Sequence, residues 1–170
     1  KELFGTAGQA YAERVERFYE FARDNHLYVS YAIVQPQIDR SRPANEQEDP
    51  FVAAGVYAER EDGIVLRGSQ MLATGGVLSD YLFLSCIKPL ASGDENYAIS
   101  VVIPINNPGL KLYVRKGYAQ GLPSVYDYPL STRYDETDAL VVFEDAFVPW
   151  EHVFIYKNKD LSFRQFFDTP

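Results

Sequence analysis

Six consecutive residues combine several groups that could bind a polar ligand: Gln35-Pro36-Gln37-Ile38-Asp39-Arg40. Pro36 disfavours helical backbone at Gln35, so we expect an irregular bend after a strand. Two amides, a carboxylate and a guanidinium on such a bend suit the polar edge of a planar cofactor. The alternative is structural: Gln37 and Asp39 cap a turn, and Arg40 pairs with Asp39 or another neighbour.

A second candidate is Thr74, which follows a predicted strand and precedes Gly75-Gly76. Because glycine has no Cβ, the threonine hydroxyl and the nearby amides can approach a planar ligand without intervening side chains. An ordinary exit from a strand has the same sequence features, so both interpretations stay open.

The elements expected to hold these residues are mostly strands. Apolar residues at three-to-four spacing predict a helix from Gln9 to Asn25, and the β-branched and aromatic stretch from Leu27 to Val34 predicts a strand. A helix is expected again from Asp160. The other predicted strands are 52–60 and 64–72, joined as a hairpin by a glycine-containing turn, then 81–87, 97–103, 110–114 and 139–147. This pattern favours a mainly β domain, an antiparallel barrel or sandwich with flanking helices.

Composition limits the classes of function. The 170 residues carry 16 Lys and Arg against 24 Asp and Glu, a net charge of −8, which disfavours nucleic acid and anionic membranes as partners. No apolar run approaches the roughly 20 residues that a membrane span needs, and the one cysteine, Cys86, cannot form an internal disulfide. We therefore expect a cytoplasmic protein.

Other catalytic signatures are absent from the sequence, which has no CxxC pair, GxSxG elbow or Walker loop. His26 and His152 are interpreted as surface groups, and Cys86 as a buried, unreactive thiol. For Arg133 the structural alternative is a buried ion pair with Asp135 or Asp138. The Gly- and Tyr-rich loop 117–128 is long enough to suggest a functional role.

Three stretches, in this order and spacing, carry a resemblance: 35–40, then Met71-Leu72-Ala73-Thr74-Gly75-Gly76, then 128–133 continuing to Val148-Pro149-Trp150-Glu151. From about Tyr19 to about Lys157, the chain resembles the oxygenase component of two-component flavin monooxygenases of the 4-hydroxyphenylacetate 3-hydroxylase family. The resemblance implies an acyl-CoA dehydrogenase-like architecture. Residues 1–27 would end an N-terminal helical domain, 28–157 would form the middle β domain, and 158–170 would begin a C-terminal helical domain.

The resemblance also implies site residues. Reduced FAD, or FMN as the alternative, would be supplied by a separate flavin reductase. Tyr31 stands where many members have a histidine that touches flavin and phenol, so it is expected to be catalytic and to bind substrate. Ser85 falls where the family contacts the substrate carboxylate, although Ser85-Cys86 replaces the usual Ser-Thr pair. The expected flavin contacts are Gln35, Gln37, Ile38, Asp39, Arg40 and Thr74.

The implied activity is hydroxylation of a phenol ortho to its hydroxyl, by a homodimer or homotetramer. A tyrosine is a poorer proton acceptor near neutral pH than a histidine, so the proton route or the substrate is expected to differ from the usual one. Two alternatives stay open. One is a related flavoenzyme on the same scaffold, either a halophenol or nitrophenol monooxygenase or a hydroxyacyl-CoA dehydratase. The other is a non-catalytic β domain that mediates assembly.

Overall fold

Strands dominate the middle of the chain. The computed structural model describes residues 1–117, 121, 124, 126–134 and 137–168. The strands are β1 (Val29–Ala32), β2 (Gly55–Glu59), β3 (Gly63–Gln70), β4 (Tyr81–Leu84), β5 (Ser100–Pro104), β6 (Leu110–Val114), β7 (Ala139–Pro149) and β8 (Val153–Ile155). The α-helices are α1 (Glu2–Gly5), α2 (Gln9–Asp24), α3 (Ser131–Tyr134) and α4 (Lys159–Arg164).

The strands form two four-stranded sheets, ordered β1-β4-β5-β8 and β2-β3-β7-β6. Most pairs are antiparallel, but β1 and β4 run parallel, with Val29 opposite Tyr81. The expectation of purely antiparallel pairing is wrong for β1 and β4. Between them the chain makes the bend and the β2-β3 hairpin, and such a long connection can return a strand in the same direction. The strands described here form two separate sheets rather than one closed barrel.

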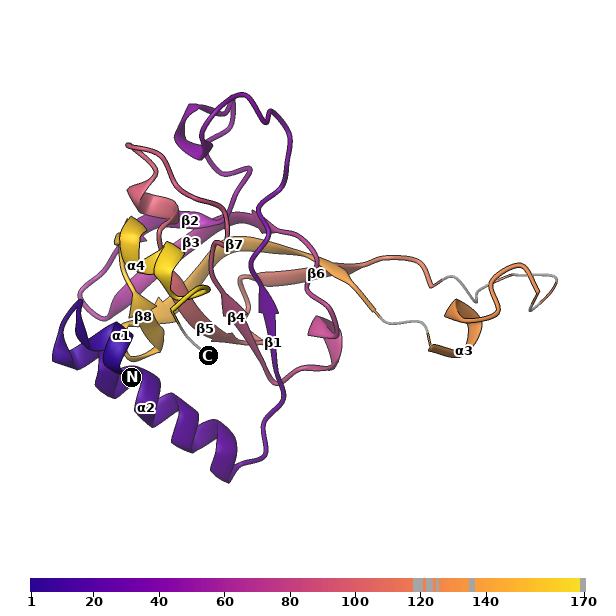
Figure 1. Ribbon diagram of the computed structural model, residues 1–170, viewed down its shortest axis with the longest axis horizontal. Helices are drawn as coiled ribbons and strands as arrows, with labels where there is room; N and C mark the ends of the chain where they lie inside the picture. Colours follow the sequence, from indigo (N-terminus) through magenta and orange to yellow (C-terminus); the bar gives the residue numbers. More distant parts are fainter. Residues whose placement is uncertain (118–120, 122–123, 125, 135–136, 169–170) are drawn as a thin grey trace.

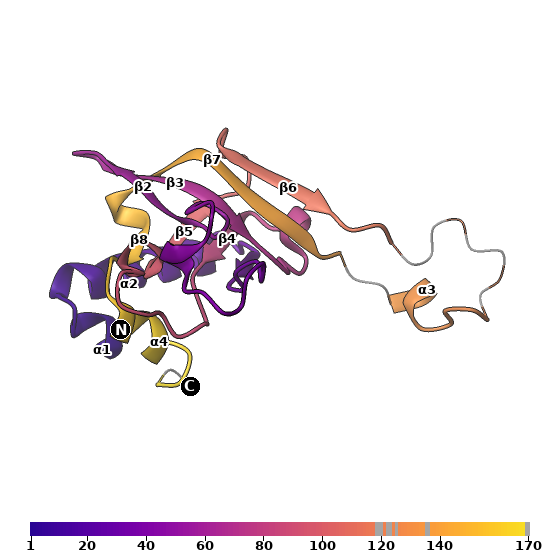
Figure 2. The same ribbon diagram turned by 90° about the horizontal axis from the view of Figure 1, so that it is seen from above.

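The inner faces of both sheets share one hydrophobic core. Leu66 on β3, Leu84 on β4, Val101 on β5 and Phe143 on β7 are all buried in the same cluster. Because side chains alternate along a strand, β4 contributes Leu82 and Leu84 to this core, and β5 contributes Val101 and Ile103. Figure 2 shows the β2-β3-β7-β6 sheet lying over the other sheet.

Helix α2 packs against the β1-β4-β5-β8 sheet at β8 and at the start of β4, and lies below the sheet in Figure 1. Its Phe18 packs against Tyr81, with ring centroids 5.3 Å apart, and against Phe154, at 5.8 Å. The predicted helix from Gln9 to Asn25 is thus confirmed to within one residue. The apolar side of this helix thus packs against the start of β4 and against β8.

His152 lies in this aromatic cluster, so its interpretation as a surface group is wrong. Its ring centroid is 6.1 Å from that of Phe18 and 6.0 Å from that of Tyr81. The Nδ1 atom is buried and has no hydrogen-bond partner among the described residues. Burial lowers the pKa of His152 below its usual value, against the opposing effect of Glu151.

This lowered pKa predicts how the stability contributed by His152 depends on pH. The folded protein binds a proton at His152 less readily than the unfolded chain does. The contribution is therefore fully present above the ordinary value of 6.5 and is lost as the pH falls below it. We expect the free energy of unfolding, measured by urea titration, to fall as the pH is lowered through 6.5. In His152→Gln the decline should be shallower, and an equal decline in both proteins would contradict this assignment.

Helix α3 lies away from the two sheets, beyond the end of β6 and the start of β7 (Figures 1 and 2). Arg133, on α3, is exposed rather than buried. The Asp138 carboxylate instead accepts a hydrogen bond from Thr74 Oγ1 and lies 3.5 Å from Arg115 Nε. The expected buried pair of Arg133 with Asp138 is therefore wrong. Asp135 and residues 118–120, 122–123 and 125 of the predicted functional loop lie outside the described residues.

Candidate functional site

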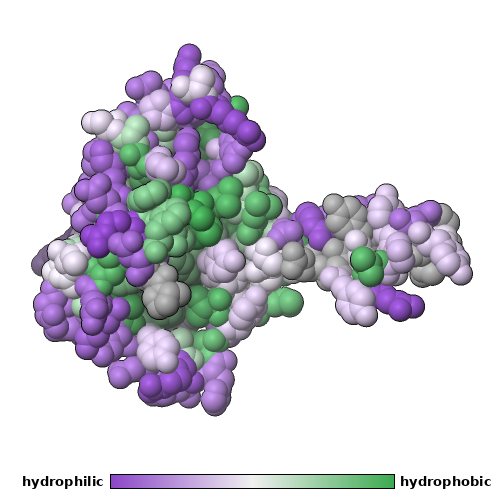
Figure 3. All heavy atoms as spheres, in the orientation of Figure 1, coloured by the Kyte–Doolittle hydropathy of each residue, from purple (hydrophilic) through white to green (hydrophobic). Residues whose placement is uncertain are grey.

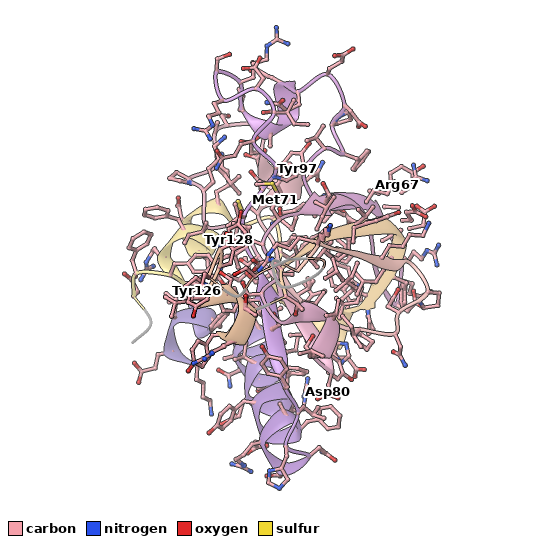
Figure 4. The ribbon with its side chains drawn as sticks, turned by 90° about the vertical axis from the view of Figure 1, so that its right-hand side faces the viewer. Arg67, Met71, Asp80, Tyr97, Tyr126 and Tyr128 are labelled. Atoms are coloured by element: carbon pink, nitrogen blue, oxygen red, sulfur yellow. The ribbon has the colours of Figure 1, made fainter. Side chains whose placement is uncertain are left out.

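The two candidate stretches lie side by side. Met71 N donates a hydrogen bond of 2.7 Å to the Val34 carbonyl, and Ser30 Oγ donates one of 2.6 Å to the Thr74 carbonyl. The end of β1 is thereby fixed against the end of β3. In Figure 4, Met71 lies near the middle of the molecule, below the loop that follows the bend. Asp80 lies lower in the same view, where its carboxylate accepts a hydrogen bond of 2.8 Å from Tyr28 N.

The bend encloses a cavity of about 340 Å³, which we call the bend cavity. Its apolar part is formed by Val34, Ala44, Val52, Ala53 and Ile87. Four of the expected flavin contacts lie together on its polar side: Gln35, Gln37, Asp39 and Arg40. Ile38, another of the expected flavin contacts, instead lines a second, apolar cavity of about 620 Å³ together with Phe51 and Leu140.

The side-chain carboxylate of Asp39 already has partners within its own loop. Its Oδ1 accepts hydrogen bonds from Ser41 N at 2.9 Å and Ser41 Oγ at 2.6 Å, and Arg42 Nε lies 3.4 Å from its Oδ2. These hydrogen bonds, and then the charge of Arg42, lower the pKa of Asp39. Gln47 Nε2 donates to the Asp39 carbonyl at 2.9 Å. The turn-capping alternative therefore holds for Asp39, but its ion-pair partner is Arg42 and not Arg40.

Gln35 is a buried polar residue of the bend cavity whose side-chain amide nitrogen has no partner among the described residues. Its side chain is 7% exposed, and its buried Nε2 has no hydrogen-bond partner among the residues the structure describes. A buried unpaired donor costs about 1–3 kcal/mol. A ligand acceptor placed in the cavity would remove that cost. Gln35 thus fits a ring with carbonyl oxygens along one edge.

The exit from β3 has an unusual conformation that the sequence did not reveal. Leu72 has a φ of 62°, in the left-handed region, and its side chain is 55% exposed. For a residue other than glycine such a conformation is strained, and strain of this kind concentrates at functional sites. Gly75 has a φ of 68°, and a Cβ there would lie 2.5 Å from Tyr28 Oη. Leucine has no preference for this conformation, so no sequence signal could have identified Leu72.

Thr74 lies next to the bend but does not line its cavity. Its Oγ1 donates a hydrogen bond of 2.6 Å to Asp138 Oδ1, and its backbone N donates one of 3.0 Å to the Leu72 carbonyl. Thr74 thus follows the end of β3, and its hydroxyl is directed at Asp138, the residue before β7.

Tyr31 lines a second hollow, the β1 hollow, of about 430 Å³. Ile33, Phe83 and Phe166 make most of it apolar. Tyr31 is 58% exposed, and within the described part of the chain its hydroxyl has no hydrogen-bond partner. The space-filling view shows hydrophobic side chains gathered at the centre of the face on which β1 lies (Figure 3). Since Ile33 lines the β1 hollow and Val34 lines the bend cavity, one stretch of chain borders both.

Ser85 is 1% exposed and its hydroxyl is used internally. Its Oγ lies 2.6 Å from Ser100 Oγ and accepts a hydrogen bond of 2.6 Å from Gln165 Nε2. Ser100 Oγ in turn donates to Gln165 Oε1 at 2.8 Å. Ser85 N donates a hydrogen bond of 3.2 Å to the Ala32 carbonyl just before the bend, but Ser85 does not line the bend cavity. The neighbouring Cys86 is also buried, and burial raises its pKa to about 11, as expected for an unreactive thiol.

A comparison with solved structures defines the class of fold. The chain superposes on an archaeal 4-hydroxybutyryl-CoA dehydratase from N. maritimus with a TM-score of 0.84. The match covers 95% of this chain and 33% of that chain at 22% identity, so it shows the fold alone. A weaker match to an acyl-CoA dehydrogenase from Geobacillus kaustophilus has a TM-score of 0.55. The fold is that of the acyl-CoA dehydrogenase-like proteins.

The sequence comparisons define the family. Residues 1–155 match the family model described as 4-hydroxyphenylacetate 3-hydroxylase N terminal, so the chain belongs to this family. It is 40% identical, over 89% of its length, to the 4-hydroxyphenylacetate 3-monooxygenase oxygenase component of Thermus thermophilus. It is 38% identical, over 86% of its length, to the 4-nitrophenol 2-monooxygenase oxygenase component of a Rhodococcus species.

The solved structures agree. A crystal structure of the oxygenase component of 4-hydroxyphenylacetate 3-monooxygenase complexed with FAD superposes with a TM-score of 0.84 at 38% identity. That match covers 97% of this chain and 33% of the other. The chain also spans 31% of the Thermus protein and 28% of the Rhodococcus protein, about a third of the length of its relatives. No helix in the described part of the chain is both long and apolar enough to cross a membrane.

Proposed function

We propose that the protein is the oxygenase component of a two-component monooxygenase that hydroxylates a phenol ortho to its hydroxyl. The observation that carries the proposal is the unpartnered amide of Gln35 in the bend cavity, beside the exit of β3, in a chain of this family. The domain limits 1–27, 28–157 and 158–170, with the two sheets packed as a sandwich in the middle domain, belong to the same proposal.

The residues of the bend fit a flavin. Gln35 Nε2 can donate to a ring carbonyl, Gln37 and Arg40 add a second amide and a positive charge, and Leu72 offers an exposed apolar surface next to Thr74. Bound reduced FAD would supply the two electrons that let O2 and a phenol give a catechol and water. FMN is the alternative, because the groups above address the ring that both flavins share. Ile38 and Asp39 contribute through the shape of the bend.

Tyr31 is proposed to bind and orient the phenol. Its unpaired hydroxyl stands at an apolar hollow large enough for a single ring, where Ile33 and Phe83 would exclude water. Tyr31 Oη can donate a hydrogen bond to the phenol oxygen or accept one from it. The proposed contact of Ser85 with substrate would require its hydrogen bonds to Ser100 and Gln165 to open, so we assign Ser85 a supporting position behind the site.

The proposed partners are a separate flavin reductase and a second copy of the protein, as a homodimer or homotetramer in the cytoplasm. A nitrophenol monooxygenase is the second candidate, favoured by the 38% identity to the Rhodococcus protein. Both candidate activities are tested by incubating the complete protein with a reductase, NADH, FAD and a panel of para-substituted phenols. We expect catechols from one class of phenol. Saturable flavin binding without any hydroxylated product would overturn the proposed reaction.

Replacing Gln35 by methionine should separate ligand binding from folding. The variant removes the donor proposed to meet the flavin, so the dissociation constant for reduced FAD should rise about 10-fold. The same change removes a buried unsatisfied amide, so the free energy of unfolding should not decrease. Anaerobic titration and urea unfolding measure the two quantities, and Gln9→Met on the exposed side of α2 is the control. Unchanged flavin affinity would exclude Gln35 as a contact.

A further inference from the structure

The start of β7 and the two residues before it hold the exit of β3 in place. Ala73 N donates a hydrogen bond of 3.0 Å to the Ala139 carbonyl. Gly75 N donates one of 2.6 Å to the Thr137 carbonyl. Strained backbone such as that of Leu72 persists only where its surroundings fix it. These two hydrogen bonds therefore belong to the frame that sets the shape of the exit.

Between these two contacts, Asp138 fixes the side chain of Thr74. Thr74 Oγ1 donates a hydrogen bond of 2.6 Å to Asp138 Oδ1, and Arg115 Nε lies 3.5 Å from Asp138 Oδ2. Arg115 N also donates to the Asp138 carbonyl at 3.0 Å. Asp138 and Arg115 are partly buried, whereas Thr74 is exposed. A carboxylate paired with a guanidinium only accepts hydrogen bonds, so the hydroxyl proton of Thr74 is directed at Asp138.

The residues after Leu72 therefore offer hydrogen-bond acceptors to a ligand. Because its proton is directed at Asp138, Thr74 Oγ1 presents only lone pairs to a group that approaches from outside. The backbone N–H groups from Ala73 to Gly76 also donate within the protein, as Thr74 N does to the Leu72 carbonyl at 3.0 Å. These amides are thus already used. A ligand group that meets Thr74 Oγ1 is best matched when it carries an N–H or O–H of its own.

We propose that Asp138 is a positioning residue which, through the hydroxyl of Thr74, makes the exit of β3 bind reduced flavin in preference to oxidised flavin. The inference rests on the proposed function, because it takes the flavin ring to lie at this exit. A reduced flavin carries an N–H on its central ring, where the oxidised ring has a bare nitrogen that needs a donor. The hydroxyl held by Asp138 can accept from that N–H but has no proton for the bare nitrogen. Arg115 holds the carboxylate in this orientation.

Replacing Asp138 by asparagine tests the direction of the Thr74 proton. The amide can turn either its oxygen or its nitrogen toward Thr74, so this direction is no longer fixed. Anaerobic calorimetry of the complete protein with reduced and with oxidised FAD gives the ratio of the two dissociation constants. We expect the preference for reduced FAD to fall about 10-fold, which lowers the midpoint potential of bound FAD by about 30 mV. Asp24→Asn removes an exposed carboxylate beside Arg23 on α2 and should leave the ratio unchanged.

A double-mutant cycle separates positioning through Thr74 from a general structural effect. Thr74 is exposed, so its variants are expected to fold. Thr74→Val should lower the preference for reduced FAD about 10-fold, and Thr74→Ser, which keeps a hydroxyl, should retain it. In the Thr74→Val protein, Asp138→Asn should change the ratio by less than about twofold.

Two outcomes of these titrations would overturn the role of Asp138 and leave the proposed function standing. One is saturable binding with an unchanged ratio in Asp138→Asn or in Thr74→Val. The other is an equal fall on Asp138→Asn with and without the Thr74 hydroxyl. Absence of saturable binding of either form of FAD to the natural protein would overturn both the role of Asp138 and the proposed function.

Discussion

Replacing Tyr31 by phenylalanine is expected to lower the rate of phenol hydroxylation about 100-fold, the lower end of the range for loss of a positioned proton-transfer group. The reason is that Tyr31 Oη is the unpaired hydroxyl at the β1 hollow. Because the side chain is 58% exposed, the free energy of unfolding should stay within about 0.5 kcal/mol of the natural protein. Single-turnover hydroxylation measures the first quantity and urea unfolding the second.

Two further variants make the Tyr31 prediction specific. Tyr31→His introduces the residue that many family members have at this place, and should retain far more activity than Tyr31→Phe. Its rate should decline below about pH 6.5, where a histidine becomes protonated. Tyr19→Phe removes another exposed tyrosine hydroxyl, on α2, and should leave the rate unchanged. A Tyr31→Phe protein as active as the natural one would exclude a role for this hydroxyl.

Replacing Gln165 by leucine is expected to destabilise the protein by about 1–3 kcal/mol, because the Ser85 and Ser100 hydroxyls keep their mutual hydrogen bond but lose the two hydrogen bonds to the amide. Gln165 Nε2 donates to Ser85 Oγ, and Ser100 Oγ donates to Gln165 Oε1, with all three residues buried. The network joins the end of α4 to β5 and to the residue after β4. Its loss should appear as a lower midpoint in urea with an unchanged slope.

The chemical basis of the Gln165 prediction can be tested by removing the hydroxyls as well. In the triple variant Ser85→Ala, Ser100→Ala, Gln165→Leu, no buried hydroxyl of this network lacks a partner, so much of the lost stability should return. Gln9→Leu, at an exposed position of α2, should change stability by less than about 0.5 kcal/mol. If Gln165→Leu were as stable as the natural protein, the network would not hold α4 to the sheet.

Local patterns predicted many of the elements. The strand 110–114 and the helix α2 agree with expectation, because alternation and three-to-four spacing are properties of the segment itself. β5 begins at Ser100 instead of Tyr97, which lies in a 3-10 turn where its hydroxyl donates to the Pro50 carbonyl at 2.5 Å. Such a contact depends on a distant loop. The parallel pairing of β1 with β4 is likewise a property of tertiary structure.

The same distinction between local sequence pattern and tertiary contact applies to the candidate site. Motif spacing pointed to the bend and to the exit of β3, and the hydrogen bond from Met71 N to the Val34 carbonyl confirms that they are adjacent. Sequence could not show that Ser85 is enclosed by partners from β5 and the end of α4, or that Leu72 adopts a left-handed conformation. The position of Lys88 at the bend cavity depends on a loop that returns from β4.

The central claim is that the bend after β1 and the exit of β3 together bind a reduced flavin. Anaerobic titration of the complete protein with reduced FAD, followed by the flavin spectrum and by calorimetry, tests it most directly. The account predicts saturable binding of one flavin per chain, weakened about 10-fold by Gln35→Met. Binding that does not saturate, or that Gln35→Met and Leu72→Ala both leave unchanged, would contradict it.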